Sequence, residues 1–341
     1  MSLNLNNLEE VAGAMVASGK GILAADESTG TIGSRLSQID TKSTFESRNA
    51  YRDLLFSADG MENYISGVIM YDETLRQSSL VEGTPYPEYL AAKGVIPGIK
   101  VDAGAHDLSS SEGEKITYGL DGLDERLKEY RKMGARFAKW RAVINITEDN
   151  PSGYCISTNA HALARYAALC QANDIVPIVE PEILMNGTHD IDDSFVVTEE
   201  VLHTVFFELY SQGVNYRGMV LKPNMVLSGY DGDNRASVEE VASATLECFA
   251  RTVPVAVGGI AFLSGGQSDE DATAHLNKMN QILGDNKSWN LSFSYGRALQ
   301  QPALKAWGGK DENVSAAQEA FMKRAELNSM ATQGKYSEDM E

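Results

Sequence analysis

Short apolar runs recur along this chain and alternate with longer segments of mixed polarity. Short, almost continuously apolar runs are typical of strands that are buried on both faces of a parallel sheet. Eight such strands separated by helices predict an α/β fold, the (β/α)8 or TIM barrel. The eight runs cover residues 21–26, 66–71, 98–103, 137–143, 176–182, 218–224, 253–259 and 290–295.

The segments between the runs carry helix signals. Ser237 and Ser268 are each followed three positions later by an acidic residue, a pattern typical of a helix N-terminus. An open doubly wound sheet is the alternative architecture, but residues 26–30 after the first run lack its glycine-rich turn. Apolar spacing and helix-stopping residues predict helices over 123–133, 159–171, 199–211 and 313–328.

Composition narrows the range of functions. The 48 acidic and 29 basic side chains leave a net charge of −19, which disfavours binding to nucleic acids. There is no apolar run of about 18 residues that would predict a membrane span, and the first residues lack the pattern of a secretory signal. The three cysteines form no CxxC pair and the five histidines show no zinc-ligand spacing. We therefore expect a cytoplasmic protein without a metal site.

The chain has no linker-like stretch rich in Gly, Pro or Ser. We therefore expect one domain over residues 1–341. The polar end at about 335–341 is expected to be frayed, because it offers little apolar surface to bury.

One lysine stands at the end of a buried run. Met219, Val220 and Leu221 precede Lys222, and Pro223, which has no N–H to donate to a sheet, ends the strand there. An ammonium group at this position loses hydration, which favours the neutral amine and makes Lys222 a candidate nucleophile. The alternative interpretation is a lysine with a covered stem whose charged head reaches water.

Other ionisable residues follow the predicted strands at the end of the barrel where TIM-barrel enzymes carry out catalysis. Side chains alternate along a strand, so Lys139 shares a face with Arg141, and Glu180 shares a face with Glu182. Buried charges are costly unless they are paired, so such a ring is either a structural network or an active site. The convergence of both signs at one barrel end favours the active site. Besides Lys222, the ring comprises Asp26, Lys100, Lys139, Arg141, Glu180, Glu182 and Arg297.

Two sets of residues suit phosphate groups. After the seventh and eighth runs, small residues allow close approach of backbone N–H groups to an anion, and an arginine can hold two phosphate oxygens. A phosphate site at this place is frequent in TIM barrels. This first set is Ser264, Gly265, Gly296 and Arg297. The second set, across the barrel mouth, is Ser28, Thr31, Arg35 and Lys100. Of these, Arg35 fits a solvated helix position equally well.

An amine, carboxylates that move protons and two phosphate sites point to imine chemistry on a phosphorylated keto sugar. This chemistry needs no metal, because the imine itself accepts the electron pair. A Lys139 cation near Lys222 would also disfavour a second positive charge there.

Several long motifs extend across the chain, including LAADESTGTIGSRL at 23–36, FAKWRAV at 137–143, IVPIVEPEIL at 175–184, LKPNMV at 221–226 and FSYGRALQ at 293–300. They resemble class I (Schiff-base) fructose-1,6-bisphosphate aldolase. The resemblance implies a TIM barrel, a homotetramer and no cofactor. It also implies reversible cleavage of fructose 1,6-bisphosphate to dihydroxyacetone phosphate and glyceraldehyde 3-phosphate, in glycolysis and gluconeogenesis.

The resemblance also implies a role for each site residue. Lys222 matches the Schiff-base lysine, and Glu180 matches the group that moves protons during imine formation. Asp26 matches the carboxylate that takes the C4-hydroxyl proton as the C3–C4 bond breaks. Lys139 matches the cation beside the imine, and Glu182 the carboxylate that orders the lysine network. The positions that match substrate-binding residues are Arg141 in the pocket, Ser264, Gly265, Gly296 and Arg297 at the C1 phosphate, and Ser28, Arg35 and Lys100 at the C6 phosphate.

Two positions depart from the family pattern. Ser34 stands where members often have a lysine, which makes the C6-phosphate site less basic and leaves the preference between bisphosphate and monophosphate open. The chain stops at Met340-Glu341 without the terminal tyrosine that assists enamine protonation in many members, so the proton donor is open too. Two alternatives are another imine-forming barrel enzyme, such as a transaldolase, and a catalytically silent scaffold that binds proteins.

Overall fold

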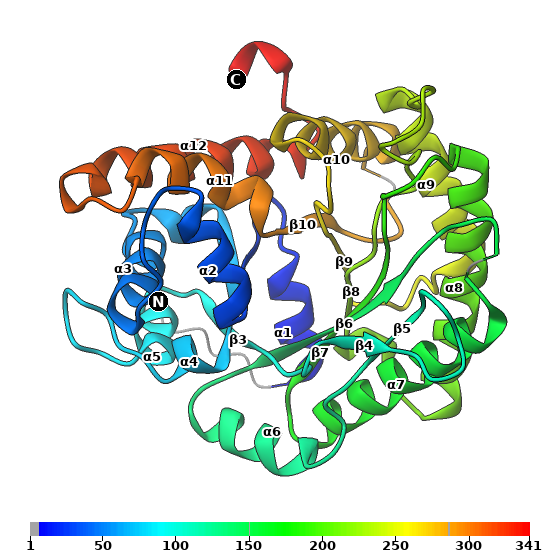
Figure 1. Ribbon diagram of the computed structural model, residues 1–341, viewed down its shortest axis with the longest axis horizontal. Coiled ribbons are helices and arrows are strands. Elements are labelled where there is room, and N and C mark those ends of the chain that lie inside the picture. The colour runs from blue at the N-terminus through cyan, green and yellow to red at the C-terminus, as the bar shows by residue number, and fades with distance from the viewer. Residues whose placement is uncertain (1–6, 150, 286) are drawn as a thin grey trace.

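Eight parallel strands close into a barrel in the computed structural model, which describes residues 7–149, 151–285 and 287–341 (Figure 1). Around the barrel each strand neighbours the next barrel strand in the chain, and β10 pairs with β1 to complete the circle. The predicted TIM barrel is therefore confirmed. The barrel strands are β1 (Gly21–Ala25), β2 (Ile65–Met70), β3 (Ile96–Lys100), β6 (Phe137–Ile144), β7 (Val176–Ile183), β8 (Val220–Leu221), β9 (Ile260–Phe262) and β10 (Leu291–Tyr295).

Helices connect the strands and form the outer layer of the molecule (Figure 1). Ser237 and Ser268 cap two of them as predicted, because each side chain accepts a hydrogen bond from the backbone N–H three residues later. The helices are α1 (Leu8–Met15), α2 (Thr29–Ser37), α3 (Phe45–Phe56), α4 (Asp72–Leu75), α5 (Tyr86–Ala92), α6 (Leu123–Lys132), α7 (Gly153–Ala172), α8 (Ile191–Ser211), α9 (Val238–Thr252), α10 (Asp269–Leu283), α11 (Arg297–Trp307) and α12 (Val314–Ala331). No helix in the described ranges is long and apolar enough to cross a membrane.

The seventh strand lies later in the chain than its apolar run predicts. Residues 253–259 follow the end of α9 at Thr252 and form a turn, and β9 begins only at Ile260. The turn is closed by a hydrogen bond from Val257 N to Pro254 O, and Val255 within it is 73% exposed. The prediction was wrong here because apolar composition does not distinguish a buried strand from an exposed turn.

The sixth strand is shorter than its run. A 3-10 turn occupies Tyr216–Gly218, and β8 ends at Leu221 because Pro223 has no N–H for the ladder. Lys222 still belongs to the barrel wall, since its backbone N–H donates to Val179 O at 2.8 Å. The strand therefore places this side chain at the barrel rim, as the sequence predicts.

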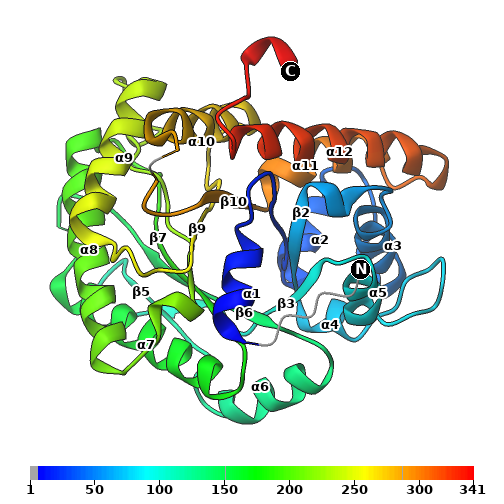
Figure 2. The same ribbon diagram turned by 180° about the vertical axis from the view of Figure 1, so that it is seen from behind.

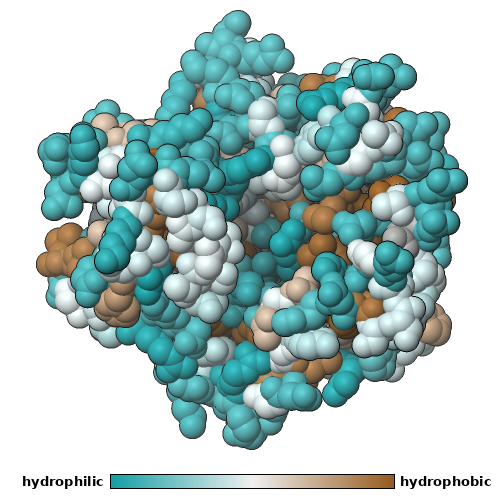
Figure 3. Space-filling model, in the orientation of Figure 1, coloured by the Kyte–Doolittle hydropathy of each residue, from teal (hydrophilic) through white to brown (hydrophobic). Residues whose placement is uncertain are grey.

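The two ends of the barrel differ. The short helix α1 lies across the N-terminal end, where Val11, Met15 and Val16 pack against Phe137 and Val176 inside the barrel (Figure 2). The C-terminal end faces the viewer in Figure 1. In the space-filling view this face is hollowed near its centre, and hydrophilic residues lie in the hollow beside a hydrophobic patch on one side (Figure 3). A small molecule therefore reaches the barrel interior from this face.

The polar pattern does not predict an antiparallel hairpin of β4 (Ala105–Asp107) and β5 (Lys115–Thr117) between β3 and α6. It lies beside the barrel mouth, because the Thr117 hydroxyl donates to Arg141 O at 2.7 Å. The hairpin therefore builds up one side of the rim.

Two residues of the C-terminal segment have partners on α10 and α12, although the segment itself extends away from the barrel (Figure 1). Tyr336 is 5% exposed, its N–H donates to Asn277 Oδ1 at 2.9 Å and its hydroxyl to Glu341 at 2.9 Å. Glu341 also pairs with the buried Arg324 of α12. These contacts involve Tyr336 and Glu341 alone, and most other residues of 335–341 are exposed, so the frayed end stays a prediction.

Candidate active site

A cavity of about 480 Å³ opens at the C-terminal end of the barrel. Strand ends and the loops that follow them form its walls, as is usual for TIM-barrel sites. Every residue that the sequence places in the site borders this one cavity. These residues are Asp26, Ser28, Thr31, Arg35, Lys100, Lys139, Arg141, Glu180, Glu182, Lys222, Ser264, Gly265, Gly296 and Arg297.

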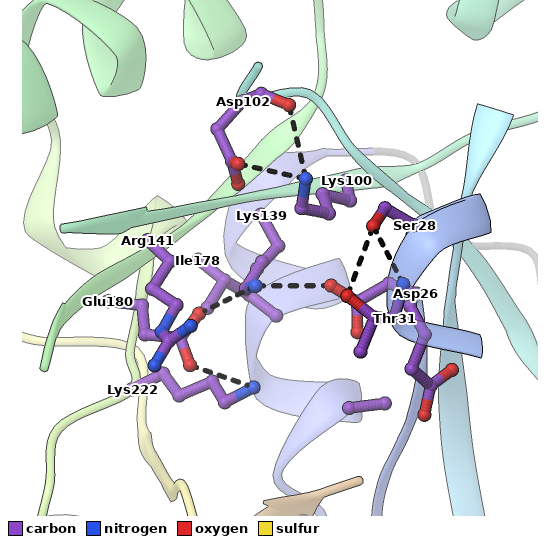
Figure 4. Close-up of polar contacts among 12 residues, drawn as sticks. Asp26, Ser28, Thr31, Lys100, Asp102, Lys139, Arg141, Ile178, Glu180 and Lys222 are labelled. Carbon is purple, nitrogen blue, oxygen red and sulfur yellow. Dashed lines mark hydrogen bonds and ion pairs between the residues drawn. The ribbon is translucent and has the colours of Figure 1, made fainter. Parts of the chain in front are cut away.

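Lys222 belongs to a chain of alternating charges (Figure 4). Its Nζ lies 3.1 Å from Glu180 Oε1, and the other oxygen of Glu180 lies 3.0 Å from Lys139 Nζ. Lys139 Nζ also donates to Asp26 Oδ2 at 3.1 Å. Lys222, Lys139 and Glu180 are only 3–5% exposed, so the head of Lys222 faces the cavity rather than bulk water. The alternative of a lysine that reaches the outer surface is thus excluded.

The charges of this chain stabilise one another. Burial by itself raises the pKa of Asp26, but the attraction of Lys139, followed by that of Lys222 and Lys100, holds the pKa well below its usual range. Burial lowers the pKa of Lys139, yet Asp26 and Glu180 outweigh that cost and raise the pKa above its usual value. At neutral pH Asp26 is therefore a carboxylate and Lys139 an ammonium.

Alternation along β6 places Lys139 and Arg141 toward the cavity and Trp140 in the layer behind it. Trp140 is fully buried and stacks on a tyrosine of α7 with ring centroids 5.6 Å apart. Arg141 lies beside Glu180 in the strand register and forms an ion pair with Glu182. Burial lowers the pKa of Arg141, but the attraction of the two glutamates raises it above its usual value, so the guanidinium stays charged.

A tight turn after β9 builds one end of the cavity. Gln267 N donates to Ser264 O at 3.2 Å, and Gly265 takes a φ of +55°, a conformation that favours glycine. Arg297 Nη2 donates to Gly265 O at 3.2 Å and to Gln267 O at 2.6 Å. Within the described residues, the amides of Ser264, Gly265 and Gly266 donate to no acceptor and Arg297 pairs with no carboxylate. These unused donors suit an anion.

The cations at the opposite end are already paired. Lys100 Nζ lies 2.9 Å from Asp102 Oδ1, and Arg35 pairs with the buried Glu27 (Figure 4 shows the first pair). Arg35 lies on α2, whose N-cap is Ser28. Arg35 is therefore held at the cavity wall by Glu27, which excludes a freely solvated position.

Within the described ranges, no group of three or more His, Cys, Asp or Glu side chains is arranged to hold a metal ion. The arrangement offers an amine, adjacent carboxylates and anion-binding groups at both ends of one cavity. It can therefore hold an elongated molecule with two anionic ends against Lys222.

The family model described as "Fructose-bisphosphate aldolase class-I" matches residues 7–341. The chain belongs to the class I fructose-bisphosphate aldolase family. This family uses a Schiff base rather than a metal, and the enzyme is a lyase that cleaves fructose 1,6-bisphosphate reversibly.

Named relatives agree with the family assignment. A probable fructose-bisphosphate aldolase class 1 of Xylella fastidiosa is 53% identical over 98% of this chain and 99% of its own. Fructose-bisphosphate aldolase 4, cytosolic, of Arabidopsis thaliana is 52% identical over 94% of this chain and 81% of its own. A structure of the Plasmodium falciparum aldolase, in complex with TRAP and a small-molecule inhibitor, superposes with a TM-score of 0.94. It is 49% identical and the match covers 97% of this chain and 95% of that one.

Sequence reasoning missed four polar residues that line the cavity of this aldolase: Glu27, Tyr71, Asp102 and Ser294. Glu27 and Asp102 hold the two cations at the distal end, and the Ser294 hydroxyl is buried without a hydrogen-bond partner among the described residues. The period-two alternation of strands was the available signal. Asp102 lies two residues after Lys100, and Ser294 lies two residues before Gly296.

Proposed function

We propose that Lys222 forms the Schiff base with the C2 carbonyl of fructose 1,6-bisphosphate. The observation that carries the proposal is the position of its Nζ, which lies in the cavity 3.1 Å from Glu180, between two groups of anion-binding residues. Attack of the amine on C2 gives a carbinolamine, and loss of water gives the imine. The imine then accepts the electron pair of the C3–C4 bond.

The neighbouring charges have separate roles in this proposal. Glu180 contacts Lys222 through one oxygen and Lys139 through the other, so it can transfer protons while the carbinolamine forms and loses water. Asp26, kept ionised by Lys139, takes the C4-hydroxyl proton as the C3–C4 bond breaks and glyceraldehyde 3-phosphate leaves. Glu182 fixes Arg141 at the pocket wall and so orders the same network.

The two phosphates bind at opposite ends of the cavity. The C1 phosphate binds the amides and hydroxyl of the turn at Ser264–Gly265, together with Gly296 and Arg297, whose donors have no competing carboxylate among the described residues. The C6 phosphate binds on the side of Ser28, Arg35 and Lys100. This end is weaker, because Arg35 and Lys100 are each paired with a carboxylate and Ser34 contributes only a hydroxyl bonded to Gly30 O.

The enzyme acts, in this proposal, without a cofactor, in the cytoplasm and as a homotetramer of one-domain chains (residues 1–341, of which 1–6, 150 and 286 lie outside the described part). Large apolar side chains on one helix, α8, support self-association: Val196, Phe207 and Tyr210 are 60–76% exposed. The three cysteines are free and buried, as is usual for a reducing compartment.

The test is reduction with borohydride in the presence of dihydroxyacetone phosphate, followed by peptide mass mapping. We expect one label, on Lys222, and a label on any other lysine would refute the assignment. Initial rates on fructose 1,6-bisphosphate, fructose 1-phosphate and sedoheptulose 1,7-bisphosphate then separate this activity from that of a transaldolase or another sugar-phosphate aldolase. If borohydride traps no dihydroxyacetone phosphate on any lysine, the result would favour the alternative of a catalytically silent scaffold.

A further inference from the structure

A buried histidine stands directly behind the turn that borders the C1-phosphate end of the cavity. His275 lies in the second turn of α10, is 6% exposed and does not itself line the cavity. Its Nδ1 lies 2.6 Å from Oε1 of Gln267, and this glutamine is 1% exposed. Polar groups buried this deeply are costly unless each one is satisfied, so the pair has one well-defined arrangement.

The hydrogen-bond partners determine that arrangement. Gln267 Nε2 lies 3.2 Å from the Ser264 carbonyl, which can only accept, so the amide nitrogen must face Ser264 and Oε1 must face His275. Oε1 also only accepts, so Nδ1 of His275 must carry the proton. Burial lowers the pKa of His275 to about 4, so at neutral pH the ring is the neutral Nδ1–H tautomer.

The hydrogen bond between His275 and Gln267 is linked to the cavity by the turn at residues 264–267. The Ser264 carbonyl accepts from both the backbone N–H and the side-chain amide of Gln267, each at 3.2 Å. Arg297 holds the carbonyls of Gly265 and Gln267. With its carbonyls held by these donors, the turn leaves its amides at positions 264–266 for an anion.

We propose that His275 is a positioning residue that holds the turn at residues 264–267 in its phosphate-binding conformation through Gln267. The proposal rests on the proposed function, which assigns the C1 phosphate to this turn. It predicts an effect on the binding of phosphate groups and not on the chemical step, because His275 touches neither Lys222 nor the substrate.

The test compares His275→Leu with His275→Asn, whose amide N–H can take the place of Nδ1–H. The leucine variant leaves a buried Oε1 unsatisfied. Its KM for fructose 1,6-bisphosphate and its inhibition constant for inorganic phosphate should both rise roughly five- to 30-fold. Because ground state and transition state lose the same contact, kcat should change little. The asparagine variant should behave like the wild type.

A double-mutant cycle tests whether His275 acts on the turn through Gln267. Gln267→Met should raise KM as His275→Leu does, and the double variant should be hardly worse than either single variant. Asn280→Leu is the matched control, because it also removes buried hydrogen bonds of α10 but none to the turn. It should lower thermal stability and leave KM unchanged.

Four results would overturn the proposal: unchanged phosphate inhibition in His275→Leu, equal impairment of the leucine and asparagine variants, an additive cycle, or a KM effect of the same size in the control. If the leucine variant does not fold, Gln267→Met and His275→Asn still decide the matter. Wild-type protein is trapped with dihydroxyacetone phosphate in parallel. Failure of that trapping on Lys222 refutes the proposed function, whereas success with unchanged phosphate inhibition in His275→Leu refutes only the role of His275.

Discussion

Replacing Arg297 with alanine tests how the cavity holds the C1 phosphate. Arg297 uses only Nη2, for the carbonyls of Gly265 and Gln267, so three of its five N–H donors remain for phosphate oxygens. No carboxylate of the described residues competes for them. Hydrogen bonds to charged groups each contribute about 1.5–3 kcal/mol, and we count one such bond from the free donors of Arg297 to the phosphate.

The expected loss for Arg297→Ala is therefore roughly 1.5–3 kcal/mol, which is about 10- to 150-fold in KM. The assay measures KM for fructose 1,6-bisphosphate and half-saturation of borohydride trapping by dihydroxyacetone phosphate, which carries only the C1 phosphate. Both values should rise together, because both molecules lose the same phosphate contact. Arg297→Lys should lose less affinity than Arg297→Ala, because lysine keeps the positive charge although it lacks the planar guanidinium.

The matched control is Arg35→Ala, at the other end of the cavity. This variant should bind fructose 1,6-bisphosphate more weakly. Its affinity for dihydroxyacetone phosphate should not change, because the smaller molecule does not reach Arg35. Unchanged affinity of Arg297→Ala for dihydroxyacetone phosphate would refute the reasoning. If Arg297→Ala lost affinity for fructose 1,6-bisphosphate alone, Arg297 would instead bind the C6 phosphate.

Further predictions concern the lysine network and the C6-phosphate site. Lys222→Met should abolish cleavage and trapping with near-native circular dichroism; normal turnover would exclude Lys222 as the nucleophile. Ser34→Lys should raise the ratio of kcat/KM for fructose 1,6-bisphosphate to that for fructose 1-phosphate, since it adds a cation beside the paired Arg35; an unchanged ratio would contradict a weak C6 site. Because the native pKa of Asp26 is depressed, its ion pair with Lys139 contributes stability that is full above about pH 4, the unfolded value. This stability is lost progressively as pH falls from there through the lower native value. The stability difference between wild type and Asp26→Asn, measured by urea unfolding, should therefore be largest at neutral pH and shrink toward pH 3; a difference that grows on acidification would reverse the assigned sign. Cleavage should persist after dialysis against a chelator, and loss of activity restored by a divalent metal would contradict the imine mechanism.

The sequence alone predicted the barrel because its evidence is repeated. Eight apolar runs alternate with helical segments, and an error in one run, such as 253–259, does not change the count. The site followed from the same regularity, since strands of a closed parallel barrel all end at one rim. Alternation along β6 and β7 therefore predicted that Lys139, Arg141, Glu180 and Glu182 meet, and they border one cavity.

Only the tertiary structure decided how these charges pair. The two oxygens of Glu180 bind Lys222, which follows β8, and Lys139, which lies on β6. No local pattern indicates which oxygen faces which lysine. The same holds for Glu27 beside Arg35 and for His275 behind Gln267. Sequence periodicity determines the face to which a side chain points, because that depends on neighbouring residues. Its partner depends on the distance between strands and helices that are far apart in the chain, and packing of the whole barrel sets that distance.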